Sequence, residues 1–563
     1  MSKPESSSPP WWHDAVVYQL YVPSFADANA DGWGDLWGVR ERLDYLADLG
    51  VDAIWLSPCY PSPQIDHGYD VADYFDINPD YGDLSVFDEV LAQAESRGIR
   101  ILMDIVPNHC SSEHKWFRSA IAAEPGSPER DRFYFRDGLG PNGDTPPNNW
   151  RSVFGGPTWT RLIDDNATPG QWYLHTFAPQ QPDFNWSNAE VVDHFDRALR
   201  FWFDRGVDGF RVDAVAVAAK APGLPDAPPV SRDVAENDVW SYNPYTVFWP
   251  TGHDYWKHWR SVIDEYQETH PGRELVTVSE AYTPGRPEQL AMYVTGEFHQ
   301  SFAFELMLAP WRSDSIEEVV RDTVATMDTL QVPPAWTINN HDTQRVVTRL
   351  GRANATELSS YTGNNLVYVD APVDLSVGLV RARALVLFAA ALPGTFYIYQ
   401  GEELGLEEVL DLPDNVRQDP IFARTEGRQI GRDGCRVPMP WTADPTTGFG
   451  FTSPNVETWL PQPKNWAPLS VEAQERNPAS MLHLYRRALR ARRSVDGPLA
   501  WVNNSPDEVV AFVRGDTLVI LNPTSTPCEL TDSVVGDRYP ILSSNDLDVG
   551  SRLVPADSCV WWR

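Results

Sequence analysis

Acidic residues stand at or near the ends of several short apolar segments, where they could perform acid–base or nucleophilic chemistry. The four acids are Asp104 in RILMDIV (100–106), Asp213 in GFRVDAV (209–215), Glu280 in LVTVSEA (275–281) and Asp342 after AWTINN (335–340). Basic and amide neighbours accompany them, namely Asn108, His109, Arg211, Asn340, His341 and Arg345. Converging carboxylates suit glycoside hydrolysis: one attacks or stabilises an oxocarbenium-like centre, and another stays protonated to give its proton to the leaving oxygen.

The spacing within these segments suggests different roles for two of the acids. Arg211 lies two residues before Asp213, so both side chains point to the same side of a strand and charge pairing would keep Asp213 ionised. An ionised Asp is a good nucleophile and a poor general acid. Glu280 has no basic neighbour in its own segment, so the acid role falls to it by elimination.

Side chains from separate segments converge only if the fold brings the segment ends together. Eight β-rich segments alternate with amphipathic stretches such as 38–50 and 86–98, which predicts a closed (β/α)8 barrel with its chemistry at the carboxyl ends of the strands. A doubly wound sheet is the runner-up, but the chain has no Gly-rich dinucleotide fingerprint. The predicted strands cover 16–22, 53–58, 100–106, 209–215, 275–281, 301–306, 335–340 and 395–400.

Long interruptions of this alternation predict three domains. A Pro-, Gly- and Asn-rich stretch, 110–185, is too long for a simple loop and predicts an inserted domain. The barrel then comprises residues 1–109 and 186–495, with a second insertion near 402–478 before the helix predicted at 480–494. Residues 496–563 switch to short strands and turns, which indicates a small all-β domain.

The segment DANADGWGD, residues 27–35, resembles the start of an EF-hand loop. The loop position that should hold a bidentate Glu is Gly38, and a strand rather than a helix precedes the loop, so it is not an EF-hand. We expect one structural Ca²⁺ here, with Mg²⁺ as a possible substitute and water completing the shell. The expected ligands are Asp27, Asn29, Asp31, the Trp33 carbonyl and Asp35.

Composition limits the partners and the compartment. With 45 basic and 79 acidic residues, the formal net charge is −34, so nucleic acid and anionic membrane surfaces are not expected partners. The five cysteines are scattered and odd in number, which argues against a disulfide framework or a zinc site. No apolar leader and no run of about 18 apolar residues occurs, so a cytoplasmic protein is expected. We further expect a monomer or homodimer.

Four segments in order, DIVPNH (104–109), GFRVDAV (209–215), VSEAY (278–282) and NNHD (339–342), resemble the conserved regions of the α-amylase family, glycoside hydrolase family 13. QPDFNW (181–186), DHGYD (66–70) and GRDGCRVPMPW (431–441) resemble its α-glucosidase and oligo-1,6-glucosidase branch more closely. The resemblance implies Asp213 as nucleophile, Glu280 as acid/base and Asp342 as transition-state stabiliser. It further implies a C-terminal β-sandwich and a substrate site that includes Tyr69, His109, Phe154, Phe177, Gln181, Arg211 and His341.

The same resemblance suggests how substrates are selected. Asp66 and Arg436 match positions that pair across the back of the pocket in family α-glucosidases, which implies an exo-acting enzyme that releases glucose from short α-glucosides. Ala214, where α-1,6-cleaving relatives usually carry Val, implies a preference for α-1,4 linkages. A transglycosidase or isomerase, such as a trehalose synthase or sucrose-processing enzyme, is the alternative, and a non-catalytic relative is a third possibility. The aromatic-rich loop 230–260 does not align with the family and leaves the acceptor open.

Overall fold

The structure is a computed structural model that describes residues 9–163, 169–230, 243–283, 287–357, 371–547 and 551–563. The eight predicted strands are all present and form one closed parallel barrel in the predicted order along the chain. Its strands are β1 (Val16–Leu20), β2 (Ala53–Leu56), β3 (Arg100–Ile105), β7 (Gly209–Val212), β8 (Val276–Ser279), β9 (Gln300–Ala303), β10 (Ala335–Thr337) and β11 (Thr395–Tyr399). The prediction of a (β/α)8 barrel is therefore confirmed.

Burial of the strands and close contact between neighbouring strands account for the closed barrel. The strands are almost wholly buried, as expected where helices cover the outer face of a parallel sheet. Gly209 allows close strand contact, because a Cβ at this position would lie 1.9 Å from the Val276 carbonyl oxygen of β8. The larger outer helices are α3 (Leu84–Ser96), α6 (Ala189–Arg205), α9 (Gly252–Thr269), α12 (Ser313–Leu330), α14 (Leu375–Ala391) and α17 (Met481–Arg492).

Several boundaries differ from the sequence-based expectation, and two of the differences have a clear local cause. The helix predicted over 38–50 is two helices, α1 (Leu36–Glu41) and α2 (Leu43–Leu49), because the backbone of Arg42 leaves the helical region. The first strand ends at Leu20 instead of continuing to residue 22, since Val22–Ser24 forms a 3₁₀ turn with Pro23 inside it. Neither difference moves a predicted site residue to another face of the barrel.

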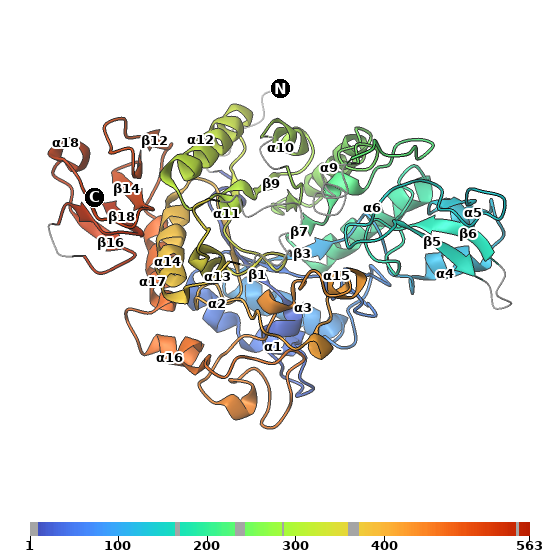
Figure 1. Ribbon diagram of the computed structural model, residues 1–563, viewed down its shortest axis with the longest axis horizontal. Coiled ribbons are helices and arrows are strands. Elements are labelled where there is room, and N and C mark those ends of the chain that lie inside the picture. The colour runs from blue at the N-terminus through green and yellow to red at the C-terminus, as the bar shows by residue number, and fades with distance from the viewer. Residues whose placement is uncertain (1–8, 164–168, 231–242, 284–286, 358–370, 548–550) are drawn as a thin grey trace.

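The insertion and the C-terminal region lie at opposite ends of the long axis (Figure 1). The insertion contains a three-stranded sheet in the order β4 (Phe135–Arg136), β6 (Pro169–Leu174), β5 (Trp159–Ile163), beside α4 (Lys115–Ala122). The C-terminal region holds a five-stranded antiparallel sheet, β12-β13-β14-β18-β16, and the pair β15-β17. These strands are β12 (Ala500–Trp501), β13 (Val510–Arg514), β14 (Thr517–Asn522), β15 (Cys528–Glu529), β16 (Pro540–Ser543), β17 (Leu553–Val554) and β18 (Ser558–Trp562). The domain boundaries 109/110, 185/186 and 495/496 stay predictions.

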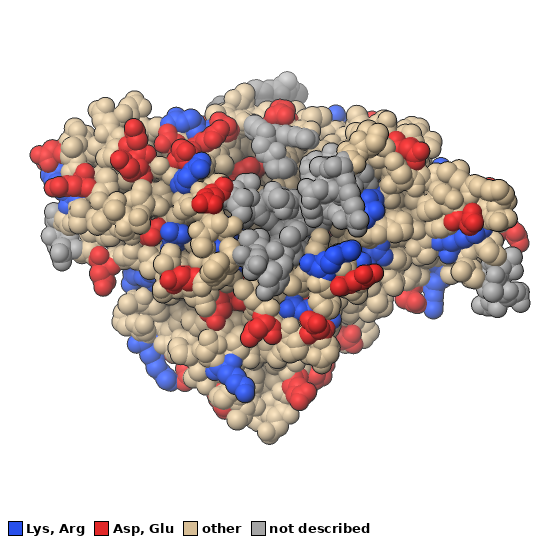
Figure 2. Space-filling view, viewed as in Figure 1, with Lys and Arg blue, Asp and Glu red and all other residues tan. Residues whose placement is uncertain are grey.

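Surface charge follows the composition. Figure 2 shows acidic side chains spread over one face, with basic side chains among them and no continuous basic patch on the part of that face that is described. Within the described residues, no helix is both long and apolar enough to cross a bilayer. All five cysteines are free thiols, and four of them are buried.

Candidate active site

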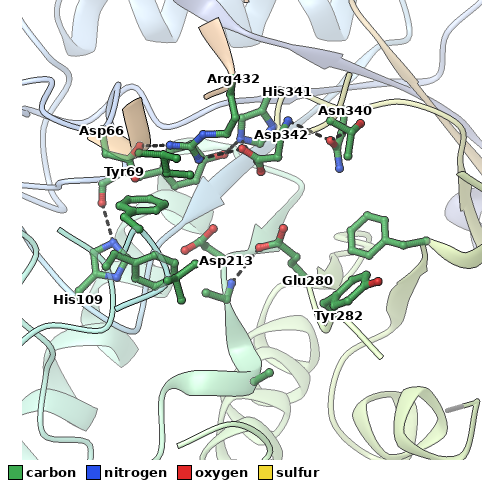
Figure 3. A pocket seen from close by; sticks show the side chains of 18 of the residues that line it. Asp66, Tyr69, His109, Asp213, Glu280, Tyr282, Asn340, His341, Asp342 and Arg432 are labelled. Carbon is green, nitrogen blue, oxygen red and sulfur yellow. Dashed lines mark hydrogen bonds and ion pairs between the residues drawn. The ribbon is translucent and has the colours of Figure 1, made fainter. Parts of the chain in front are cut away.

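A pocket opens at the carboxyl ends of the barrel strands and contains the three predicted catalytic acids. Asp213 follows β7, Glu280 follows β8 and Asp342 lies beyond β10. Figure 3 shows their carboxyl groups directed toward the same open space. The other lining residues are Asp66, Tyr69, His109, Val153, Phe154, Phe177, Ala214, Ala216, Tyr282, Phe304, Met307, Asn340, His341, Thr343, Ile421 and Arg432.

Arg211 stands at the centre of a buried group of carboxylates. Its Nη1 lies 2.7 Å from Asp213 Oδ1 and 2.9 Å from Asp104 Oδ1, and its Nη2 lies 2.6 Å from Glu280 Oε2. The interpretation that Glu280 has no basic partner is therefore wrong. Arg211 is level with Val278 on the adjacent strand β8, so the side chain of Glu280, two residues further on, returns to the same guanidinium.

One guanidinium facing three carboxyl groups controls their protonation. Burial raises the pKa of Asp213, and the carboxylates of Glu280 and Asp104 raise it further, against the opposing effect of Arg211. Burial likewise raises the pKa of Asp104 to about 6 despite its bonds to Arg211. The pairing of Arg211 with Asp213 is as predicted, but its lowering effect does not bring the pKa of that acid below the ordinary value. A cluster of this kind retains a proton near neutral pH, which is the condition for one carboxyl to serve as acid and another as nucleophile.

Asp342 has the opposite environment. Burial alone would raise its pKa, but His341, Arg432 and Arg436 together hold that pKa well below the ordinary value. Its Oδ1 accepts from Arg432 Nη1 at 3.0 Å and from Arg436 Nη2 at 2.9 Å. Asp342 is therefore ionised throughout the physiological range, as a group that stabilises developing positive charge must be.

Asp66, which lines the pocket, pairs with a different arginine from the one predicted. Asp66 Oδ1 lies 2.6 Å from Arg432 Nη2, whereas Arg436 binds Asp342 and the His341 carbonyl. A 3₁₀ turn, Asp433–Cys435, separates the two arginines and directs Arg432 into the pocket and Arg436 behind it. Arg432 also binds Asp419 through Nε at 2.7 Å. Sequence reasoning quoted this segment but assigned the wrong arginine.

Polar side chains of the remaining predicted site residues form one connected network. The Tyr69 ring stacks on the His341 ring with centroids 5.3 Å apart, and the Tyr69 hydroxyl donates to Asp104 Oδ2 at 2.9 Å. Gln181 Nε2 donates to Asp66 Oδ2 at 3.0 Å. Gln181, Arg211 and Arg436 are fully buried and stand behind the lining residues, so they orient groups that face the pocket.

Apolar residues form the walls. Phe154 and Phe177, both predicted, pack at 5.3 Å between ring centroids, and Phe154 lies under the Arg432 guanidinium. Ile421 from α15 (Pro420–Arg424) joins the same cluster. Sequence reasoning missed Ile421, and it also missed Tyr282, Phe304 and Met307 on the other wall, although Tyr282 lies within a quoted motif. Of loop 230–260, residues 231–242 lie outside the described part of the chain.

Ala214, directly after the predicted nucleophile Asp213, adopts a left-handed backbone conformation with φ of 46°. That conformation is uncommon for any residue with a Cβ and strained for a branched one. It turns the chain sharply away from β7, so the Ala214 N–H donates to Glu280 Oε2 at 3.2 Å. The same turn thus places Asp213 and holds Glu280.

Comparison with known proteins places this geometry among carbohydrate-active enzymes. The alpha amylase catalytic domain matches residues 19–497. An oligo-1,6-glucosidase of Parageobacillus thermoglucosidasius is 33% identical, with 96% of each chain covered. Alpha-glucosidase MAL32 of Saccharomyces cerevisiae is 32% identical, with 97% of each chain covered. The crystal structure of an alpha-glucosyl transfer enzyme, XgtA, is 33% identical and superposes with a TM-score of 0.81 over 99% of both chains.

Proposed function

Because the chain belongs to the alpha-amylase family and is a glycoside hydrolase, we propose that it is an exo-acting, retaining α-glucosidase that removes glucose from short α-glucosides. The observation that supports this most is the placement of Asp213, Glu280 and Asp342 around one pocket that the Asp66–Arg432 ion pair also lines. We propose that this pair closes one end of the pocket, which then fits a single non-reducing glucosyl unit whose hydroxyls the carboxylate and guanidinium bind.

The proposed chemistry requires Asp213 to be ionised and the proton retained by the carboxyl cluster to lie on Glu280. Ionised Asp213 attacks the anomeric carbon as the bond to the leaving oxygen breaks, and Glu280 gives its proton to that oxygen. Asp342, held ionised by two arginines, stabilises the positive charge that develops on the sugar ring. Water then attacks the glucosyl ester of Asp213 while Glu280 takes the proton from water, which restores both side chains.

Product analysis tests the proposal. Maltose, isomaltose, sucrose and trehalose should be supplied separately, with chromatography to follow glucose and any transfer products. Release of glucose from maltose, with no internal cleavage of soluble starch, is the expected result; random internal cleavage would contradict a closed pocket. The similarity to an alpha-glucosyl transfer enzyme supports a second candidate, in which a sugar or alcohol replaces water as acceptor, and transfer products in excess of free glucose would identify it.

Ala214→Val tests the proposed preference for α-1,4 linkages. A branched side chain beside the nucleophile should crowd an α-1,4-linked aglycone and shift the kcat/KM ratio of maltose to isomaltose toward isomaltose by about 10–200-fold. Val at a positive φ should also destabilise the protein by about 1–3 kcal/mol. Steady-state kinetics on both disaccharides, with thermal melting, measures the two effects separately.

Ala214→Gly is the matched control, because it removes the methyl group and relaxes the same backbone. We expect it to leave the stability equal or higher and the linkage ratio within a fewfold of wild type. If Ala214→Val changes only the melting temperature, the residue does not select the linkage.

We also retain the proposal that loop 27–35 binds one Ca²⁺. The fit of the loop is partial. Asp27 Oδ2 accepts from the Gly32 N–H at 2.7 Å, and Asp35 caps α1 and accepts from Gly38, Ala28 and Asn29 N–H groups. Within the part of the chain that is described, no three His, Cys, Asp or Glu side chains gather as a ready metal site. Coordination would therefore require these carboxylates to share their oxygens between the amides and the cation.

Removal of calcium should lower stability more than it lowers catalysis. We expect chelation followed by dialysis to reduce the melting temperature by several degrees, because three carboxylates then repel one another without a cation. Added Ca²⁺ should restore the loss, and Asp31→Asn should weaken that recovery. If chelation changes neither melting temperature nor activity, hydrogen bonds alone hold the loop.

The unpaired cysteines support a reducing compartment, so a cytoplasmic location remains our expectation, as does a monomer or homodimer. Cell fractionation and light scattering test these two points.

A further inference from the structure

A buried lysine behind the pocket takes no part in the mechanism above, yet it joins three segments of the site. Lys220 lies in the loop that follows the nucleophile strand, and its side chain is fully buried. Its Nζ lies 2.9 Å from Asp183 Oδ2 and 2.9 Å from Asn108 Oδ1, and it also donates to the Val217 carbonyl. The three N–H groups of the ammonium thus each have an acceptor, which fixes the position of the Lys220 side chain.

The lysine determines which way the Asn108 amide faces. An ammonium can only donate, so the atom of Asn108 that faces Lys220 must be the oxygen. The amide nitrogen then faces the opposite way and lies 3.1 Å from Asp183 Oδ1 and 3.1 Å from His109 Nδ1. Because this nitrogen donates, Nδ1 of His109 must accept and therefore carries no proton.

The proton of a neutral His109 consequently lies on Nε2. That nitrogen is 3.1 Å from the Tyr69 carbonyl, which can only accept, and also 3.1 Å from Gln181 Nε2, whose amide donates to Asp66 Oδ2. The Tyr69 carbonyl is therefore the acceptor for the Nε2 proton, and the ring lines the pocket beside Phe177. Burial lowers the pKa of His109 to about 4, and Lys220 opposes the Asp183 carboxylate, which raises it. His109 is thus neutral, with one tautomer, and can donate a hydrogen bond but takes no proton at the pH of the cytoplasm.

We propose that Lys220 is a positioning residue that fixes the orientation of Asn108 and, through it, the neutral Nε2–H tautomer of His109 in the glucose-binding pocket. The proposal rests on the proposed function only for its kinetic test. Its structural content, one amide orientation and one tautomer, can be measured without any substrate.

Lys220→Met removes the charge and keeps the length of the side chain. The Asp183 carboxylate is then unopposed near His109, so the pKa of His109 should rise and the acidic limb of the kcat/KM profile should move up by about one unit or more. Asn108 loses the donor that faces its amide oxygen, and kcat/KM at pH 7 should fall at least about tenfold through misorientation. The other ionisable groups around His109 are unchanged in this variant: Tyr69 and Asp66 from the loop after β2, and Asp213 and Glu280 across the pocket.

The double variant Lys220→Met/Asp183→Asn separates positioning from packing. It removes both charges and keeps the shape, so the acidic limb should return toward wild type although Lys220 is still absent. A purely structural lysine would instead lower the melting temperature of Lys220→Met with no change in the pH profile and no recovery in the double variant, and that result would overturn the proposal.

Nitrogen-15 spectra of histidine-labelled protein read the tautomer directly, with His109 assigned by its loss in a His109→Gln sample among the 12 histidines. We expect a protonated Nε2 in wild type and a mixed or charged ring in Lys220→Met. If Lys220→Met fails to fold, Asn108→Leu keeps the Lys220–Asp183 ion pair and tests the same point. A wild-type tautomer and wild-type kcat/KM in Asn108→Leu would exclude the proposal. A failure of the proposed function would change which substrate is turned over and leave these spectra unaffected.

Discussion

Asp213→Asn is expected to lower kcat by about 10³-fold or more, because no covalent intermediate can form when the nucleophile is an amide. This loss corresponds to at least about 4 kcal/mol of transition-state stabilisation. The folded protein should keep or gain stability, since the substitution removes one of three buried carboxyl groups that share Arg211. Single-turnover kinetics and thermal melting measure the two quantities.

Asp208→Asn is the control for that experiment. Asp208 lies next to the other end of the same strand, where it accepts the Ile101 N–H at 2.9 Å, and it is remote from the pocket. Its substitution should leave kcat within about twofold of wild type while changing stability modestly. If Asp213→Asn retains more than a tenth of the wild-type turnover, Asp213 is not the nucleophile.

Arg432→Met should have the largest effect on stability. Arg432 is buried and binds three carboxylates, those of Asp66, Asp342 and Asp419. Without it these charges lie buried with one fewer partner, which costs about 3–5 kcal/mol of unfolding free energy. The KM for maltose should rise as well, because the pocket loses a guanidinium that lines it. Urea unfolding and steady-state kinetics give both values.

The pH dependence of this destabilisation has a defined sign. Burial raises the pKa of Asp419, but Arg432 and its hydrogen bonds hold the pKa at about 2, below the ordinary 3.8. The stabilisation from this pair is therefore complete above pH 3.8 and is lost as the pH falls toward 2. The penalty of Arg432→Met should be largest near neutral pH and smaller below about pH 4.

Arg97→Met provides the comparison for Arg432→Met, because Arg97 forms an equally short 2.6 Å ion pair with the exposed Asp44 at the surface. A surface pair should contribute less than about 1 kcal/mol. Equal losses in the two variants would contradict the role given to the buried network.

The barrel could be predicted from the sequence because each strand is a short apolar run between turn residues. Such a run can be recognised without knowledge of the rest of the fold. The convergence of Asp213, Glu280 and Asp342 on one pocket could be predicted because motif and strand end coincide. The arginine assignment failed, since a one-turn 3₁₀ segment decides which of Arg432 and Arg436 faces the pocket. The Glu280–Arg211 contact was missed because it depends on the register between neighbouring strands, which no single segment encodes.

The apolar residues of the pocket walls could not be predicted either, because they come from segments that are far apart in the sequence. Phe304 and Met307 follow β9, and Ile421 lies on α15, where Arg424 Nε donates to the Gly155 carbonyl of the insertion at 3.1 Å. These three residues reach the pocket through packing between segments that are distant in the sequence. For α15 and the insertion, the separation is more than 250 residues. Local sequence patterns do not predict such packing.

The anomeric configuration of the first glucose released from maltose tests the double-displacement mechanism most directly. Proton NMR spectra recorded within the first turnovers, before mutarotation, distinguish the two anomers. Attack by Asp213 followed by attack of water inverts the anomeric carbon twice, so α-glucose should appear first. If β-glucose appears first, a single displacement by water has occurred, and the assignment of Asp213 as nucleophile and Glu280 as acid/base is wrong.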